Sequence, residues 1–173
     1  MVIVLCPGIH PPEVTESFRR RFTPLHSYSC LVIPETIAPY NGPAIANFVC
    51  HHCDRTEPLL FMGFSAGVVG AVFAAHHWQQ QGGQVLSLWA WDGWGVPLAG
   101  SFPTVRVSHD YFTHWSSGLL GQGDRTFWAD PPIEHLELWR RPDQVMGWQA
   151  AGWGLQVQEP LSLNAFGKII IPL

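Results

Sequence analysis

The sequence predicts a three-layer α/β/α sandwich built on a mostly parallel β-sheet of about six strands. Short apolar runs rich in β-branched residues recur along the chain, and helical or turn-rich segments separate them, as in a parallel sheet covered on both faces. Hydrophobic residues make up 47% of the chain and charged residues only 13%, which excludes disorder. With 173 residues, we expect one domain over 1–173.

The six predicted strands share an apolar run of strand length bounded by turn residues. They are Val2 to Cys6, Cys30 to Pro34, Leu59 to Met62, Val85 to Trp91, Val105 to Ser108 and Thr126 to Ala129. Right-handed crossovers would bring the loops that follow these strands to one edge of the sheet, where doubly wound folds bind their ligands.

Four helices are expected between or after these strands. Two of them show apolar residues at helical spacing, one is rich in Gly and Ala and ends at a Gly pair, and one begins at a capping Asp before two prolines. They begin near Glu13, Pro43, Ala66 and Asp130, and the last two run to about Gln81 and Trp139. From Pro142 onward the alternation weakens, so this tail could add an edge strand or fold over the sheet.

Residues 63–67 match the pattern G-x-S-x-G between a predicted buried strand and the Gly- and Ala-rich helix. A nucleophilic serine on a strained strand-to-helix turn needs this context, because bulky side chains do not fit beside the turn. We therefore predict that Ser65 is a nucleophile. The alternative is a serine that caps a helix in an inert β-α turn.

A serine nucleophile needs a histidine that accepts its proton and a carboxylate that orients the histidine. His135 follows the last predicted strand, and Asp110 follows the strand before it, directly after His109. Asp92, after the strand at Val85 to Trp91, is the second choice of acid.

The strand that ends at Pro7 and Gly8, the turn with Ser65, and the order of Asp110 and His135 resemble the α/β-hydrolase superfamily, in particular its compact serine hydrolases. The resemblance covers about Val2 to Trp139. It implies an α/β-hydrolase-type sheet in which His135 is the base, and Asp110, or else Asp92, is the acid. It also implies an oxyanion hole formed by the backbone N–H groups of Ala66 and Ile9. Only residues 109–125 are available for a lid, so we expect an open site.

The resemblance implies a serine hydrolase but does not choose its substrate. We expect the protein to cleave an ester or thioester of a small, apolar substrate. Aromatic residues gather in the loops at the predicted active edge, where they could form a substrate pocket. The expected substrate-binding side chains are His10, Phe64, Trp94, Phe112 and Trp115. No metal or organic cofactor is required. A non-catalytic binding protein of the same fold with an incomplete triad is the alternative.

The remaining features exclude other classes of protein. A net charge of −4 argues against nucleic acid and anionic membranes as partners. Residues 50–53 read Cys-His-His-Cys, but a second ligand pair is missing, so we expect neither a zinc site nor a redox site there. With no export signal visible, we expect a cytoplasmic protein with free thiols that is a monomer or a weak homodimer.

Overall fold

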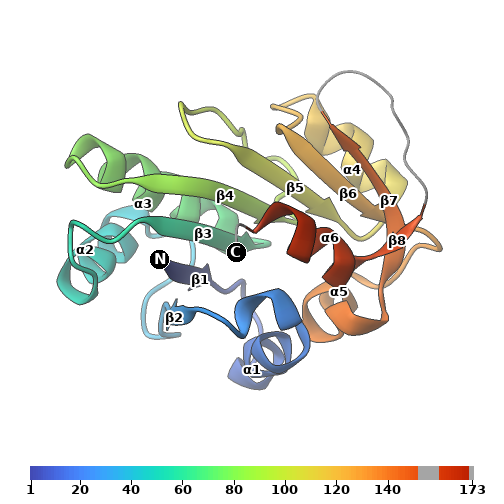
Figure 1. Ribbon diagram of the computed structural model, residues 1–173, viewed down its shortest axis with the longest axis horizontal. Coiled ribbons are helices and arrows are strands. Elements are labelled where there is room, and N and C mark those ends of the chain that lie inside the picture. Colours follow the sequence, from blue (N-terminus) through green and yellow to red (C-terminus); the bar gives the residue numbers. More distant parts are fainter. Residues whose placement is uncertain (152–159, 172–173) are drawn as a thin grey trace.

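The computed structural model describes residues 1–151 and 160–171, which form an α/β fold around a single eight-stranded sheet (Figure 1). The strand order is β2-β1-β3-β4-β5-β6-β7-β8. The strands are β1 (Val2–Cys6), β2 (Ser29–Val32), β3 (Leu59–Phe64), β4 (Val85–Trp91), β5 (Thr104–Ser108), β6 (Arg125–Ala129), β7 (Met146–Ala151) and β8 (Leu161–Ser162). The α-helices are α1 (Pro12–Arg21), α2 (Gly42–His52), α3 (Gly67–Gln80), α4 (Tyr111–Gly118), α5 (His135–Arg140) and α6 (Leu163–Ile170).

The sheet is mostly parallel, as predicted, because β1 to β6 all run in one direction. All six predicted strands are present, each within two residues of its expected bounds. The number of strands is larger than predicted, since β7 and β8 extend the sheet antiparallel beyond β6. Neither has an apolar run: β7 reads MGWQAA and β8 has two residues, so their pairing depends on the neighbouring strand rather than on a local pattern.

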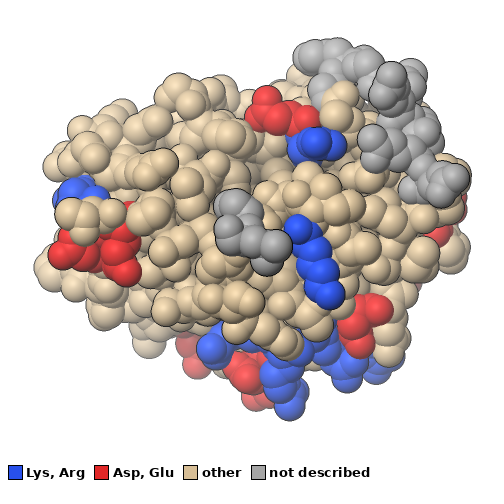
Figure 2. Space-filling model, viewed as in Figure 1, with Lys and Arg blue, Asp and Glu red and all other residues tan. Residues whose placement is uncertain are grey.

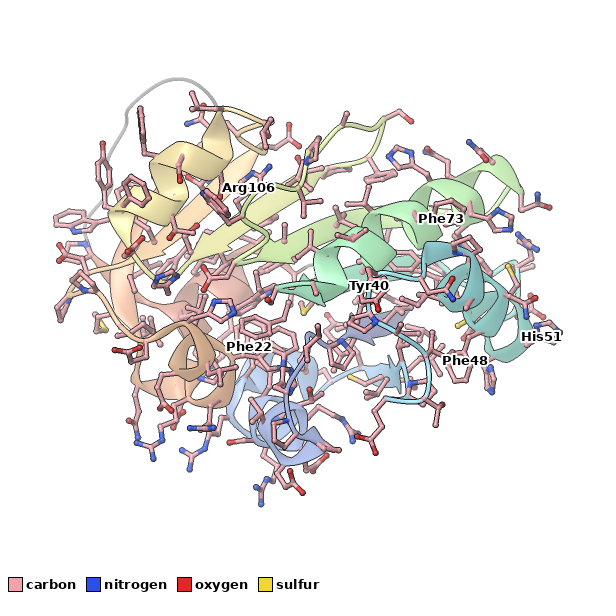
Figure 3. All side chains as sticks on the ribbon, turned by 180° about the vertical axis from the view of Figure 1, so that it is seen from behind. Phe22, Tyr40, Phe48, His51, Phe73 and Arg106 are labelled. Carbon is pink, nitrogen blue, oxygen red and sulfur yellow. The ribbon has the colours of Figure 1, made fainter. Side chains whose placement is uncertain are left out.

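Helices cover both faces of the sheet, which gives the three layers that the sequence predicts (Figure 1). On one face α1 packs against α5, where the ring of Phe18 stacks on Trp139 with centroids 3.6 Å apart, and α6 adds Phe166 to the same core. On the other face α2 and α3 bury Ile45 and Ala71, and α4 packs on β5 and β6 (Figure 3).

Helix α3 approaches the sheet closely because its sheet-facing side has small residues. A Cβ atom at Gly67 would overlap the carbonyl oxygens of Cys6 and Pro7 at the end of β1. A Cβ atom at Gly70 would overlap the side chain of Ile45 in α2. The start of α3 therefore lies directly against the loop that follows β1.

Two expectations about the later helices are wrong. The helix expected from Asp130 begins only at His135, and Asp130 instead accepts a hydrogen bond from the indole of Trp148 at 2.7 Å. Residues 111–118, expected as a loop, form α4, which the side chain of Asp110 caps. The tail from Pro142 does both things expected of it: β7 and β8 extend the sheet, and α6 packs Phe166 into the core. Residues 152–159 and 172–173 lie outside the described residues.

Arg106 of β5 is a charged side chain with only 2% of its surface exposed, at the end of the molecule where α4 covers the sheet (Figure 3). Its guanidinium donates hydrogen bonds to the carbonyl oxygens of Gly121, Val96 and Leu120. Burial lowers its pKa to about 10, so it remains charged at neutral pH. Arg106 thus ties together the loops that follow β4 and α4.

Close to this charge, His114 of α4 stacks on Trp128 with ring centroids 4.3 Å apart. Its Nδ1 atom is buried without a hydrogen-bond partner among the described residues. Burial, and secondarily the Arg106 charge, lower its pKa to about 4. The folded protein therefore holds His114 neutral, whereas the unfolded chain protonates it below about pH 6.5.

We expect the free energy of unfolding to fall by about 2 kcal/mol through His114 as the pH drops from 7 to 4. Between these two pKa values the imidazole of His114 is protonated in the unfolded chain but not in the folded protein. The contribution of neutral His114 to the free energy of unfolding is therefore complete above the unfolded pKa and is lost as the pH falls toward the folded pKa of about 4. Urea unfolding at pH 7, 5.5 and 4.5 measures the slope. His114→Phe should flatten it, whereas His51→Phe, at an exposed position on α2 (Figure 3), should leave the slope unchanged. Equal slopes in wild type and His114→Phe would contradict this assignment.

Charged side chains are sparse on the face shown in Figure 2 and gather at its lower margin, where α1 lies in Figure 1. Two of the arginines of α1 form exposed ion pairs, Arg19 with Glu16 and Arg21 with Asp143, each at 3.0 Å. The basic run is a solvated helix face. Within the described residues, no helix has the length and apolar character needed to cross a membrane.

Candidate active site

Polar side chains converge where β3, β4, β5 and β6 end, because these parallel strands are neighbours in the sheet. Ser65 follows β3, Asp92 follows β4, His109 follows β5, and His135 begins α5 after β6. All four line one cavity of about 440 Å³. Because β3 to β6 are neighbours in the sheet, four separate segments of the chain each contribute one side chain to this cavity.

Ser65 occupies a strained turn between β3 and α3. Its φ of 53° lies in the left-handed region that is unfavourable for residues other than glycine. Its N–H donates to the carbonyl of Trp91 at 2.8 Å, which ties the turn to the end of β4. This conformation presents the side chain of Ser65 to the cavity, as the G-x-S-x-G pattern predicts.

The carboxylate bonded to His135 belongs to Asp92, at 2.8 Å between His135 Nδ1 and Asp92 Oδ2. This contact favours Asp92, the second choice of acid, over Asp110. The side chain of Asp110 instead accepts the N–H of Thr113 at 2.6 Å and caps α4. Asp92 reaches His135 from the end of β4 because its backbone turns sharply, with a φ of 48°. Its side chain is only 1% exposed.

His109 was not among the predicted site residues, although it directly follows β5 and precedes Asp110. Its Nδ1 lies 2.8 Å from Asp92 Oδ2, and its backbone N–H donates to Asp92 Oδ1 at 2.9 Å. These hydrogen bonds to Asp92 are the main reason that the pKa of His109 is raised. Asp92 thus accepts from two imidazoles and one amide, which holds its carboxylate in a single orientation. A histidine next to the predicted acid was the signal available in the sequence.

The ring of His135 rests on Phe64, with centroids 4.7 Å apart, and Phe64 in turn stacks on Trp139. Phe64, a predicted substrate contact, is fully buried, and its ring packs against that of His135. In the described part of the chain, neither Ser65 Oγ nor His135 Nε2 forms a hydrogen bond. Both residues line the same cavity, and such contacts often tighten only when substrate binds.

The loop after β1 lies against the turn of Ser65. A Cβ atom at Gly8 would be 3.0 Å from Ser65 Cβ and 2.9 Å from the carbonyl oxygen of Phe64, so only glycine lets the loop approach this closely. Ile9 follows in this loop, with 76% of its surface exposed, and Ala66 begins the turn into α3. Among the described residues, the amides of Ala66 and Ile9 donate to no protein acceptor.

Three of the predicted substrate-binding side chains line a cavity, two in one cavity and one in another. Trp94 and Phe112 line the cavity with Ser65, and the Trp94 indole donates to Ser116 Oγ at 3.1 Å. The Trp115 ring is 6.4 Å from that of Phe112, outside the cavity lining. His10 lines a neighbouring cavity together with Gly8 and Ile9.

Asp92, His109 and His135 form the one group of three metal-ligand side chains found in the described residues, with ligand atoms within 4.8 Å. Two imidazoles and a carboxylate suit zinc. In this structure, however, both Nδ1 atoms are already hydrogen-bonded to Asp92 Oδ2, which accounts for the cluster without an ion. At residues 50–53 the two imidazoles bond helix carbonyls, those of Asn47 and Phe48.

Neither a scan against protein-family models nor a search of curated proteins finds a match to this chain. What can be said of its activity therefore comes from the site itself.

Proposed function

We propose that this protein is a serine hydrolase of the α/β-hydrolase type, which cleaves an ester or thioester through an acyl-enzyme. The observation that carries the proposal is a strained serine facing the same cavity as a histidine whose Nδ1 is bonded to a buried carboxylate. These are the parts of a nucleophile, base and orienting acid, and they occur in the order Ser65, Asp92, His135.

In the proposed mechanism, Ser65 Oγ attacks the carbonyl carbon of the substrate and its proton passes to His135 Nε2. Asp92 holds the proton on His135 Nδ1, so that Nε2 is the atom able to accept, and it stabilises the imidazolium that forms. The N–H groups of Ala66 and Ile9 receive the negative charge on the carbonyl oxygen. His135 then protonates the leaving oxygen or sulfur, and water repeats the sequence to release the acid.

His109 acts in this mechanism as a positioning residue. Its ring and backbone N–H both bond to Asp92, so the carboxylate stays aligned with His135 rather than rotating toward other donors. No metal or organic cofactor takes part in the proposed reaction.

A fluorophosphonate probe tests the proposal, because it reacts covalently only with an activated serine. We expect labelling of the wild-type protein, no labelling of Ser65→Ala, and slower labelling of His135→Ala. Ser101→Ala removes an exposed hydroxyl that donates to Gln79 Oε1 and, within 1–151 and 160–171, to nothing else, so this variant should label like wild type.

The alternative is a binding protein of the same fold that hydrolyses nothing. A folded wild-type protein that does not label, and that cleaves no ester or thioester, would favour this alternative and refute the hydrolase proposal. Circular dichroism of each variant verifies that it is folded.

A further inference from the structure

A second cavity, of about 540 Å³, is lined by the loop of Pro7, Gly8, Ile9 and His10, whereas Ser65 and His135 line the first cavity. Its inner walls are apolar and come from the end of β1, from β2 and its following loop, and from α2. Side chains of these walls include Cys6, Val32, Ile33, Ile37 and Ile45. The charged residues at this cavity are Glu16, Arg19 and Glu35, all of them exposed to solvent. This is a pocket of the size and character that binds small apolar groups.

The second cavity adjoins the nucleophile through a single loop. Gly8 lines this cavity, and the same residue lies in contact with the turn of Ser65. Ile9, which supplies one of the two proposed oxyanion amides, also lines it. A carbonyl group bound between the amides of Ile9 and Ala66 would therefore lie next to residues that line this cavity.

The mechanism determines which part of a substrate lies on each side. His135 must protonate the leaving oxygen or sulfur, so the leaving group has to lie on the side of His135. That side is the first cavity, which contains His135 and His109 together with Trp94 and Phe112. The acyl chain, on the other side of the carbonyl carbon, then has the second cavity available.

We infer that the second cavity binds the acyl chain of the substrate and that this chain is an aliphatic group. The inference rests on the proposed function. Aliphatic side chains form the inner walls, and no unpaired charge lies deep in the pocket, so a hydrocarbon chain gains binding energy for each methylene buried there. The leaving group lies in the first cavity, beside Trp94 and Phe112, and contributes less to the choice between substrates.

Two isomeric esters test the assignment, because one has a long alkyl chain on the acyl side of the carbonyl and the other has it on the leaving-group side. We expect kcat/KM for ethyl hexanoate to exceed that for hexyl acetate by about tenfold or more. Across ethyl acetate, butyrate and hexanoate, kcat/KM should rise by about two- to fourfold for each added methylene.

Filling the second cavity should remove this preference. Ile37→Trp, at a partly exposed wall position, should lower kcat/KM for ethyl hexanoate by about tenfold and leave hexyl acetate and fluorophosphonate labelling unchanged. Val32→Trp fills the pocket from β2 and should give the same result if Ile37→Trp does not fold. Ile169→Trp makes the matched change at an exposed position on α6 and should keep the wild-type preference.

The outcomes separate this inference from the proposed function. If Ser65 labels and the esters are cleaved, but hexyl acetate is preferred or Ile37→Trp and Val32→Trp change nothing, the acyl assignment is wrong and the hydrolase proposal stands. If Ser65 labels and neither isomer is cleaved, the acyl assignment is again wrong. If Ser65 neither labels nor supports any hydrolysis, the proposed function itself fails.

Discussion

Ester hydrolysis is expected to fall by about 10⁴-fold in Asp92→Asn and to change by less than about threefold in Asp110→Asn. An Asn at position 92 places an NH₂ donor where the carboxylate now accepts from His135 Nδ1. The imidazole would then move its proton to Nε2, the atom that must accept the proton of Ser65. The loss should appear in kcat rather than in KM, because orientation of the base matters most in the transition state.

Asp110→Asn is the matched control because it makes the same chemical change 18 positions along the chain, at a residue that caps a helix. Asn caps helices about as well as Asp, so α4 should remain intact. Steady-state kinetics on ethyl hexanoate, together with thermal unfolding of both variants, measures the two effects. If Asp110→Asn loses activity and Asp92→Asn keeps it, Asp110 is the acid and the assignment to Asp92 is refuted.

Gly67→Ala is expected to destabilise the protein by about 3 kcal/mol, or about 10 °C in Tm, and to abolish most of the hydrolysis. The added Cβ atom would overlap the carbonyl oxygens of Cys6 and Pro7, which are backbone atoms that a side-chain rotation cannot clear. Either the start of α3 or the loop after β1 has to move. These two segments contain the amides of Ala66 and Ile9, so the proposed oxyanion site would open.

Gly118→Ala is the control for this substitution. At this helical position, the nearest atom to an added Cβ is 3.9 Å away, and the change should stabilise the protein slightly or leave it unchanged. Calorimetry and kinetics on the two variants measure both effects. If Gly67→Ala unfolds at the wild-type temperature with full activity, α3 and the β1 loop do not pack as tightly as described.

The main elements could be predicted because their signals are local. The apolar runs of β1 and β4 have their full length in the sequence, and the glycines around Ser65 indicate the close packing that its turn needs. Strands β7 and β8 could not be predicted in this way. Strand β7 pairs with β6 in a register that places Trp148 opposite Trp128. No apolar run in the sequence indicates this pairing.

The later helices show the same limit. Asp130 before two prolines is a strong local start signal, yet the helix begins at His135, because the side chain of Asp130 bonds to Trp148 of β7 instead. Asp110, in turn, looks like an acid at the end of a strand and serves as the cap of a helix that its own sequence did not indicate. In both cases a contact or an element further along the chain decides the role of an aspartate.

The sequence by itself determined the order of the six parallel strands, the strand-to-helix turn that holds Ser65, and the position of His135 after the last parallel strand. The tertiary structure decided that Asp92, not Asp110, contacts His135, that His109 shares this carboxylate, and that Gly8 lines an apolar cavity. The physical reason is the sequence distance over which each signal acts. Apolar periodicity and turn chemistry depend on residues that are close together in the chain. Which carboxylate reaches an imidazole depends on strand order and on backbone turns such as that at Asp92, which only the assembled sheet brings together.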